Sequence, residues 1–289
     1  MQPQLSLTKH SLPLDGAHLH WEEAGQGTPL ILIHGSLCDL RYWRWQMPEF
    51  SRHFRVIAVS LPGCWPDAIG AAEAPDADAE TRRRHALHDP RYGIAAHVRA
   101  IIALCEHVAD NGPVHLLGHS RGAQVALEAA LATPGCVGRL VLADPGFAFT
   151  GEPAEPAVHM QVANRLGHAP LDEVIGAFVD AVNGPDTWRR TVPWFKEMVR
   201  ANAWTLLPQL KDFERSVDLE RLQALSCPVL LIGGEHSPAR YGSRIDTLLR
   251  AVPGAEKEVI PRAAHGMNLA NARRFNEAVL RFLVAQHDA

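Results

Sequence analysis

The sequence predicts an α/β fold built on a mostly parallel sheet. Continuous apolar runs, such as residues 29–33, 114–117 and 229–232, recur along the chain, and stretches with apolar residues at helical spacing separate several of them. Such runs are typical of parallel strands that are buried on both faces. Alternation of strand and helix predicts a parallel sheet with flanking helices. The length of 289 residues and the hydrophobic content of 47% allow one large domain with an insertion.

The expected elements follow one another from the N-terminus. Residues 5–12 and 17–24 are interpreted as a hairpin, because Asp15-Gly16 tolerates the positive φ angles of a tight turn. Apolar runs and helical periodicity then predict strands at 29–33, 54–59, 114–117, 140–143, 229–232 and 259–260, and helices at 93–109, 121–133, 240–251 and 271–285.

Two regions interrupt this alternation. Residues 62–92 are rich in Ala, Asp, Glu, Pro and Arg, and we interpret them as an irregular surface excursion whose basic run at 81–85 is a solvated face. Residues 145–220 lack sheet-type runs but carry helical patterns and several aromatic side chains. We therefore expect a core formed by residues 1–144 and 221–289, with residues 145–220 as a helical insertion over the sheet.

The composition argues against several classes of partner. There are 28 basic and 32 acidic residues, whereas a protein that binds nucleic acid through phosphates usually has a net basic surface. The chain has no stretch of about 20 apolar residues, and its N-terminus lacks the apolar run of a signal peptide. The scattered cysteines form no CxxC pair, which is typical of reduced thiols. We expect a cytoplasmic protein without a nucleic-acid or membrane partner.

The segment GHSRG at residues 118–122 lies between an apolar strand and a helix-like stretch. A serine on such a strand-to-helix turn is held in a strained, exposed conformation. Gly118 and Gly122 suit the turn, because a Cβ at either position would clash with the neighbouring backbone. The helix N-terminus behind Ser120 favours negative charge that develops nearby. This context predicts Ser120 as a catalytic nucleophile.

An oxyanion hole is expected at the end of an earlier strand. Residues 34–36 follow the apolar run 29–33 and have the sequence HGS. A catalytic serine needs N–H donors that face the developing oxyanion. We expect the backbone N–H groups of Ser36 and Arg121 to supply them, with Leu37 as the alternative to Ser36.

These segments together resemble the α/β-hydrolase superfamily over nearly the whole chain. The resemblance rests on IHGS at 33–36, GHSRG at 118–122 and AHG at 264–266, which occur in the matching order and at matching separations. It implies the α/β-hydrolase fold with a helical cap, and no metal or organic cofactor. Within the superfamily the chain resembles a capped group of esterases, lactonases, carbon–carbon bond hydrolases, epoxide hydrolases and haloalkane dehalogenases. Ser120 argues against the last two, which have Asp as the nucleophile on this strand-to-helix turn, called the nucleophile elbow.

The resemblance also places the base, but it leaves the acid open. His265 lies past the last expected strand, in a loop that carries the catalytic histidine in the family, whereas His34 is expected to pack within its turn. The commonest acid position holds Ser237, which cannot stabilise an imidazolium as a carboxylate does. Some superfamily members carry the acid after the strand that follows the elbow helix, where this chain has Asp144. Glu235, or no functional acid, is the alternative.

Aromatic residues of the insertion indicate a largely apolar pocket for a small-molecule substrate. Trp188, Trp194 and Trp204 are candidate wall residues, together with Leu37. Arg121 either pairs with a nearby carboxylate or approaches an anionic substrate. We expect a serine hydrolase that cleaves a carboxylic ester or a related acyl bond through an acyl-enzyme. Carbon–carbon bond hydrolysis, acyl transfer and non-catalytic ligand binding are the alternatives.

Overall fold

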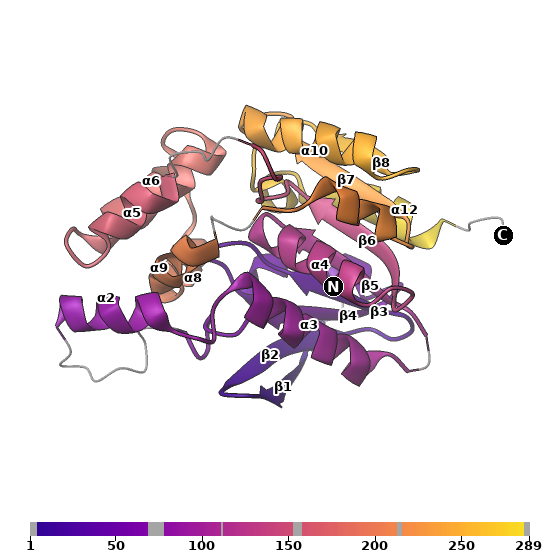
Figure 1. The fold of residues 1–289 in the computed structure, drawn as a ribbon, viewed down its shortest axis with the longest axis horizontal. Coiled ribbons are helices and arrows are strands. Elements are labelled where there is room, and N and C mark those ends of the chain that lie inside the picture. The colour runs from indigo at the N-terminus through magenta and orange to yellow at the C-terminus, as the bar shows by residue number, and fades with distance from the viewer. Residues whose placement is uncertain (1–4, 69–77, 111, 153–157, 213–215, 286–289) are drawn as a thin grey trace.

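The computed structural model describes residues 5–68, 78–110, 112–152, 158–212 and 216–285. Within these residues eight strands form one sheet in the order β1-β2-β4-β3-β5-β6-β7-β8 (Figure 1). The strands are β1 (Thr8–Leu14), β2 (Ala17–Ala24), β3 (Pro29–Ile33), β4 (Arg55–Ser60), β5 (Val114–His119), β6 (Val137–Ala143), β7 (Val229–Gly234) and β8 (Glu256–Ile260).

The sheet is mostly parallel, as expected. Strand β2 pairs antiparallel with β1 and with β4, while every other pairing between described strands is parallel. The carboxyl ends of the parallel strands therefore meet at one edge, which is where open α/β sheets place their ligands. Loops that follow β3, β5, β6, β7 and β8 all begin at this edge.

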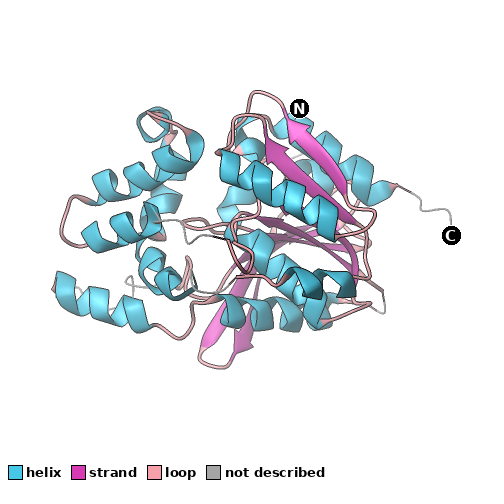
Figure 2. Ribbon diagram, turned by 45° about the horizontal axis from the view of Figure 1, so that its top comes forward, coloured by secondary structure: helices cyan, strands magenta, loops and turns pink. Residues whose placement is uncertain are grey.

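Helices cover both faces of the sheet (Figure 1, Figure 2). Alternate residues of one strand point to opposite faces, so that Ile31 packs into a core with α3 and α4, while Leu30 packs into a second core with α1 and α12. The helices are α1 (Met47–Phe50), α2 (Ala79–His88), α3 (Ile94–Val108), α4 (Arg121–Ala132), α5 (Val158–Arg165), α6 (Leu171–Asn183), α7 (Thr187–Arg190), α8 (Pro193–Ala201), α9 (Leu206–Gln209), α10 (Ala239–Ala251), α11 (Met267–Ala270) and α12 (Ala272–Val284), with 3₁₀ turns η1 (Leu40–Trp43), η2 (Ala203–Thr205), η3 (Leu210–Asp212) and η4 (Leu219–Ala224).

The described part of residues 145–220 adds no strand to the sheet, and its helices α5 to α9 form a group beside it (Figure 1). The two ends of this segment meet. The Thr150 N–H donates to the Val217 carbonyl at 3.0 Å, and the Val217 N–H donates to the Ala148 carbonyl at 2.9 Å. This closure is what an insertion into the core requires, and we call the segment the cap. Its boundaries at 145 and 220 stay a prediction.

Helix α2 corrects our interpretation of the region before the elbow. Residues 69–77 of the expected excursion lie outside the described residues, but α2 is regular and lies beside α9. Arg83 Nη1 donates to the Ala163 carbonyl of α5 at 2.8 Å, and the Arg82 guanidinium lies 5.5 Å from the Trp204 ring centroid. The solvated-face interpretation is wrong for these two arginines, because α2 docks on the cap.

Candidate active site

Ser120 occupies a strained turn between β5 and α4. Its φ of 55° and ψ of −119° lie outside the regions that residues with a Cβ ordinarily adopt. The turn is held by its own backbone: the Ser120 N–H donates to the Ala143 carbonyl at 2.9 Å, and the Ser120 carbonyl accepts from the N–H groups of Ala123 and Gly146 at 3.0 Å. The structure therefore has the strand–turn–helix geometry that the GHSRG motif indicates.

The glycines of the motif are required by close backbone approach. A Cβ on Gly118 would lie 2.2 Å from the Gly122 carbonyl oxygen, and a Cβ on Gly122 would lie 2.3 Å from the carbonyl oxygen of Ile33. Both distances are far below van der Waals contact, so that α4 can begin directly against the end of β3 only with glycine at these positions.

Gly146, in the loop that follows β6, packs closely against the Ser120 turn. This residue was not identified from the sequence. A Cβ at this position would lie 2.8 Å from the Ser120 carbonyl carbon and 3.0 Å from Ser120 Oγ. We expect Gly146→Ala to slow fluorophosphonate labelling of Ser120 by about 10- to 100-fold, because a shift of about 1 Å in a reacting group can cost that much. The second-order rate constant of labelling, read by intact mass, measures the effect.

The matched control is Gly242→Ala. This exposed glycine of α10 has nothing within 4 Å of the added Cβ, and the labelling rate is expected to stay at the wild-type value. Equal labelling rates in wild type and Gly146→Ala would contradict the prediction, because the loop after β6 would then accommodate the added Cβ without displacing Ser120.

His265 and Asp144 form a buried pair at the carboxyl edge of the sheet. His265 Nδ1 lies 3.0 Å from Asp144 Oδ2, with the carboxylate side chain fully buried and the imidazole 7% exposed. Asp144 directly follows β6, and Ser237 follows the adjacent strand β7. Ser237 Oγ donates to the same oxygen, Asp144 Oδ2, at 2.5 Å. The serine at the family's commonest acid position is thus a hydrogen-bond donor to a carboxylate from the next strand.

Glu235, the alternative acid, is engaged elsewhere. Its Oε2 accepts from the Arg262 backbone N–H at 2.7 Å and lies 3.9 Å from His236 Nε2, on the exposed side of the loop. No hydrogen bond or ion pair joins Glu235 to His265 among the described residues. The geometry therefore brings Asp144 to the imidazole.

Three residues that sequence reasoning missed hold the His265 loop. Tyr241 stacks on the His265 imidazole, with ring centroids 4.3 Å apart. The His119 ring contacts the same imidazole in a tilted arrangement, with ring centroids 4.5 Å apart. His119 Nε2 donates to the His265 carbonyl at 2.8 Å, and burial lowers the pKa of His119 well below its usual value, so that it stays neutral there. Asn183 Oδ1, at the end of α6, accepts from the Gly266 N–H at 2.7 Å. These contacts cross between distant segments, so no local pattern marks them.

His34 packs within its turn, as expected. Its Nδ1 donates to the Gly35 carbonyl at 2.8 Å, and its Nε2 accepts from the Leu61 N–H at 3.1 Å. Burial lowers the pKa of His34 to about 4. A neutral histidine whose two nitrogens are both occupied connects the loops after β3 and β4 and is not available as a base.

The two segments that we expect to form the oxyanion hole both adjoin Ser120. Ser36 and Leu37 line the same cavity as Ser120, and Leu37 has a positive φ of 62°. A Cβ on Gly35 would lie 3.0 Å from Ser120 Cβ, so this loop packs tightly on the elbow. Arg121 begins α4 directly after the serine. Its N–H and that of Ser36 or Leu37 stay our candidates for the oxyanion donors.

The Arg121 side chain turns away from the cavity. Its Nη2 lies 2.8 Å from Asp212 Oδ2, with both side chains less than 10% exposed, and its guanidinium lies 4.6 Å from the Tyr92 ring centroid. Asp212 Oδ1 accepts from the Ile94 N–H at 3.1 Å. Of the two interpretations, pairing with a carboxylate is the one the structure displays. The pair joins the elbow helix to the end of the cap.

Breaking this pair is expected to destabilise the fold. We expect Asp212→Asn to lower the free energy of unfolding by about 3–5 kcal/mol, because it leaves the Arg121 charge buried without a counter-charge. Urea denaturation followed by circular dichroism measures the loss. The control Glu49→Gln removes the exposed ion pair with Arg52 and is expected to cost about 0–1 kcal/mol. Similar losses in the two variants would contradict the prediction.

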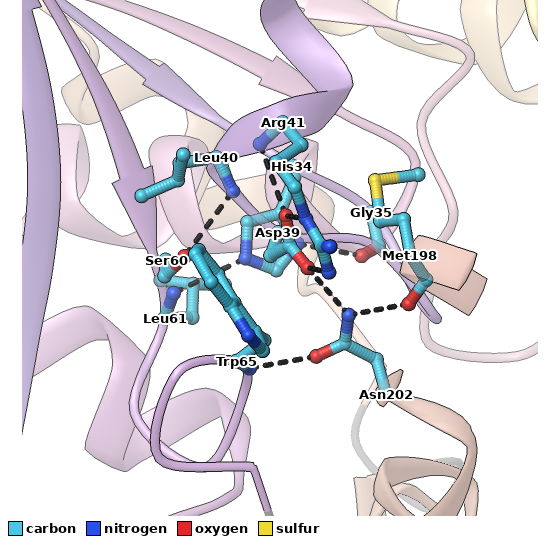
Figure 3. Close-up of polar contacts among 10 residues, drawn as sticks. All are labelled: His34, Gly35, Asp39, Leu40, Arg41, Ser60, Leu61, Trp65, Met198 and Asn202. Atoms are coloured by element: carbon cyan, nitrogen blue, oxygen red, sulfur yellow. Dashed lines mark hydrogen bonds and ion pairs between the residues drawn. The ribbon is translucent and has the colours of Figure 1, made fainter. Parts of the chain in front are cut away.

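A second polar network joins the cap to the loops after β3 and β4 (Figure 3). Asp39 is fully buried and accepts from Arg41 Nε at 2.9 Å and Nη2 at 2.6 Å. Asn202, which follows α8, donates from Nδ2 to Asp39 Oδ2 at 2.7 Å and to the Met198 carbonyl at 2.8 Å, while its Oδ1 accepts from the Trp65 N–H at 2.8 Å. All three hydrogen bonds of this amide go to the protein, so Asn202 positions loops.

A cavity of about 550 Å³ lies between the cap and the carboxyl edge of the sheet, and both Ser120 and His265 line it. Trp194 lines this cavity, but Trp188 and Trp204 do not. Trp188 packs on α6, where its ring would collide with a Cβ on Gly176, and Trp204 packs between α2 and the cap. Both rings are half-buried in these contacts and lie outside the cavity lining, so the expectation that they form the pocket wall is corrected.

In the described part of the chain, no three His, Cys, Asp or Glu side chains gather in a way that would hold a metal ion. None of the described helices is both long enough and apolar enough to span a membrane.

The fold and this site define a class. An eight-stranded, mostly parallel sheet carries a serine elbow after β5, a histidine loop after β8 and a cap over the carboxyl edge. A family model described as "Alpha/beta hydrolase family" matches residues 30–278. The chain belongs to the alpha/beta hydrolase family, as the three sequence motifs indicate.

Relatives in this family are similar over most of the chain. The chain is 23% identical over 264 residues to (E)-2-((N-methylformamido)methylene)succinate hydrolase from Acinetobacter baylyi, an alignment that covers 91% of this chain and 93% of that protein. It is 26% identical over 264 residues to carboxylesterase YbfK from Bacillus subtilis, an alignment that covers 88% of this chain and 79% of that protein. The crystal structure of the same carboxylesterase superposes with a TM-score of 0.74 at 22% identity, covering 98% of this chain and 93% of that one.

Proposed function

We propose that this protein is a serine hydrolase that cleaves a carboxylic ester or a related acyl bond through an acyl-enzyme. The observation that carries the proposal is the convergence of two groups on one cavity: Ser120 on its strained elbow, and His265 with its Nδ1 3.0 Å from a buried carboxylate. A nucleophile and an oriented base are the parts that acyl transfer to water needs. The name of the Bacillus subtilis relative, a carboxylesterase, supports the ester as the bond.

In the first half-reaction, Ser120 Oγ attacks the acyl carbon and His265 Nε2 takes the hydroxyl proton. Asp144 accepts the Nδ1–H, which leaves Nε2 as the basic nitrogen and stabilises the imidazolium that forms. The N–H of Arg121, with that of Ser36 or Leu37, binds the oxyanion. His265 then protonates the leaving alcohol.

In the second half-reaction, water replaces the alcohol. His265 removes a proton from the water, the hydroxide attacks the Ser120 ester, and the proton returns to Ser120 Oγ as the acid leaves. The apolar side chains of Leu37, Trp194 and Phe195 around the cavity suit an apolar acyl or alcohol group.

The first test needs no knowledge of the substrate. The protein is treated with a fluorophosphonate and its intact mass is read, for wild type, Ser120→Ala and Ser243→Ala, the last an exposed serine on α10. We expect one label on wild type and on Ser243→Ala and none on Ser120→Ala. Labelling that persists in Ser120→Ala, or no labelling of wild type, would overturn the proposal and favour a ligand-binding role.

A further inference from the structure

Among the described residues that line the cavity, two are arginines and none is an aspartate or glutamate. Arg190 ends α7 in the cap, and Arg262 follows β8 in the core loop that leads to His265. Both side chains are exposed, and both belong to the lining along with the exposed apolar residues Trp45 and Val192. Cap and core thus each place one exposed arginine on a cavity whose lining is mostly apolar.

The Arg190 guanidinium has no carboxylate partner among the described residues. Its Nη2 donates to the Pro185 carbonyl at 3.0 Å. The nearest acidic residue in sequence, Asp186, pairs instead with Arg189, whose Nε lies 3.2 Å from its carboxylate. Arg189 does not line the cavity. The two consecutive arginines of α7 therefore have different surroundings, one neutralised and one not.

Arg262 is held in a defined backbone conformation. Its φ is 56°, a backbone angle that a residue other than glycine adopts only when its surroundings stabilise it. The backbone N–H donates to Glu235 Oε2 at 2.7 Å. Glu235 is the acidic residue that contacts Arg262, and it binds the backbone of that residue. No ion pair joins its carboxylate to the Arg262 guanidinium in the described part of the chain.

Unneutralised cations beside apolar walls select for an anion. The low dielectric of the walls strengthens the field at the mouth of the cavity, and a guanidinium binds a carboxylate through two parallel hydrogen bonds. Ser120, Arg190 and Arg262 line the same cavity, and the two arginines are exposed. We therefore expect an apolar chain whose reacting carbonyl is at Ser120 to run toward the two arginines on its way to solvent.

We propose that the substrate is an ester whose apolar chain carries a carboxylate at the end away from the scissile bond, and that Arg190 and Arg262 bind this carboxylate. This inference rests on the proposed serine hydrolase function and names the substrate class of the same site. The two arginines bind and orient the substrate and take no part in bond cleavage.

The test uses matched esters. These are the mono-p-nitrophenyl esters of adipic, pimelic and suberic acids, and the same compounds with the far carboxyl group methylated. In wild type we expect kcat/KM for the best acid ester to exceed that for its methylated partner by about 10-fold, since an exposed ion pair contributes a few-fold and there are two. Arg190→Gln and Arg262→Gln each lower the value for the acid ester about 3-fold and leave the methylated ester unchanged. Added salt narrows the preference.

Arg189→Gln is the matched control, because it removes the same charge one residue away without altering the cavity lining. It is expected to leave both values unchanged. Equal kcat/KM for the two esters in wild type, or an equal effect of Arg189→Gln and Arg190→Gln, would overturn the inference.

Failure of the inference and failure of the proposed function give different results. Fluorophosphonate labelling of Ser120 without any preference for the acid ester overturns only the inference. If Ser120 does not label and neither ester is cleaved, the proposed function fails. Calorimetric binding of suberic acid monomethyl and dimethyl esters to wild type then decides the inference alone: tighter binding of the acid that Arg190→Gln weakens supports it, and equal binding of the two overturns it.

Discussion

Asp144→Asn is expected to lower kcat about 10⁴-fold with an ester that wild type cleaves. The Asp144 carboxylate accepts the Nδ1–H of His265 at 3.0 Å, away from solvent. An asparagine can neither stabilise the imidazolium nor impose the tautomer that leaves Nε2 basic, and losses of this size follow in serine enzymes whose triad carboxylate is amidated. Steady-state kinetics measure the fall, with circular dichroism to check that the fold is kept.

Two variants show whether the effect belongs to this carboxylate. Glu235→Gln removes the alternative acid and is expected to keep kcat within a few-fold of wild type, because Glu235 binds only the backbone of its loop. Ser237→Ala removes one donor to Asp144 Oδ2 and is expected to cost about 10-fold, a single charge-assisted hydrogen bond. If Glu235→Gln abolishes turnover while Asp144→Asn stays near wild type, the acid is Glu235.

The second large effect is acid unfolding, driven by four buried histidines. Burial lowers the pKa of His34 and His115 to about 4 and that of His97 and His119 well below the usual value. The folded pKa is below the unfolded one, near 6.5, so the unfolded chain binds more protons between the two values. The free energy of unfolding is therefore intact above about pH 6.5 and falls as the pH drops below it.

Each histidine contributes a slope of about 1.4 kcal/mol per pH unit in that window, and the four together about 5 kcal/mol per unit. Between about pH 7 and pH 5 the loss approaches the whole stability of an ordinary domain, so we expect the protein to unfold near the lower value. Urea denaturation across this range measures the slope.

His97→Gln isolates one member of the set. Its side-chain amide can replace His97 Nε2 as the donor to the Pro62 carbonyl, now at 2.9 Å, without a group that titrates. The slope is expected to fall by about a quarter. A stability that stays constant from about pH 8 to pH 5 would mean that these histidines take up protons in the folded protein at the same pH as in the unfolded chain.

Much of the fold could be predicted because its signals are local. The continuous apolar runs marked the buried parallel strands. The strands predicted at 114–117 and 229–232 are each two residues longer in the structure, at Val114–His119 and Val229–Gly234. The edge strand Glu256–Ile260 was predicted only at its last two residues, because its other positions face solvent and are polar. Helix α2 was also missed. It packs on the cap rather than on the sheet, so the alternation of strands and helices that marks the core does not reveal it.

The nucleophile and the histidine loop were found because each depends on a short run of residues, and the turn geometry of GHSRG allows little else than glycine at its ends. The acid was harder. Asp144 and Ser237 are far apart in sequence, and they meet only because β6 and β7 are neighbours in the sheet.

Local sequence was therefore enough for the class of fold, for Ser120 and for the loop of His265, because backbone sterics and strand burial leave a signature within a few residues. The partners of these groups depend on which segments pack together across the sheet and the cap. The pairing of Arg121 with Asp212, the contact of Asn183 with Gly266 and the placement of Arg190 and Arg262 on one cavity all arise from that packing. No periodicity encodes it, because its free energy comes from contacts between residues distant in the chain.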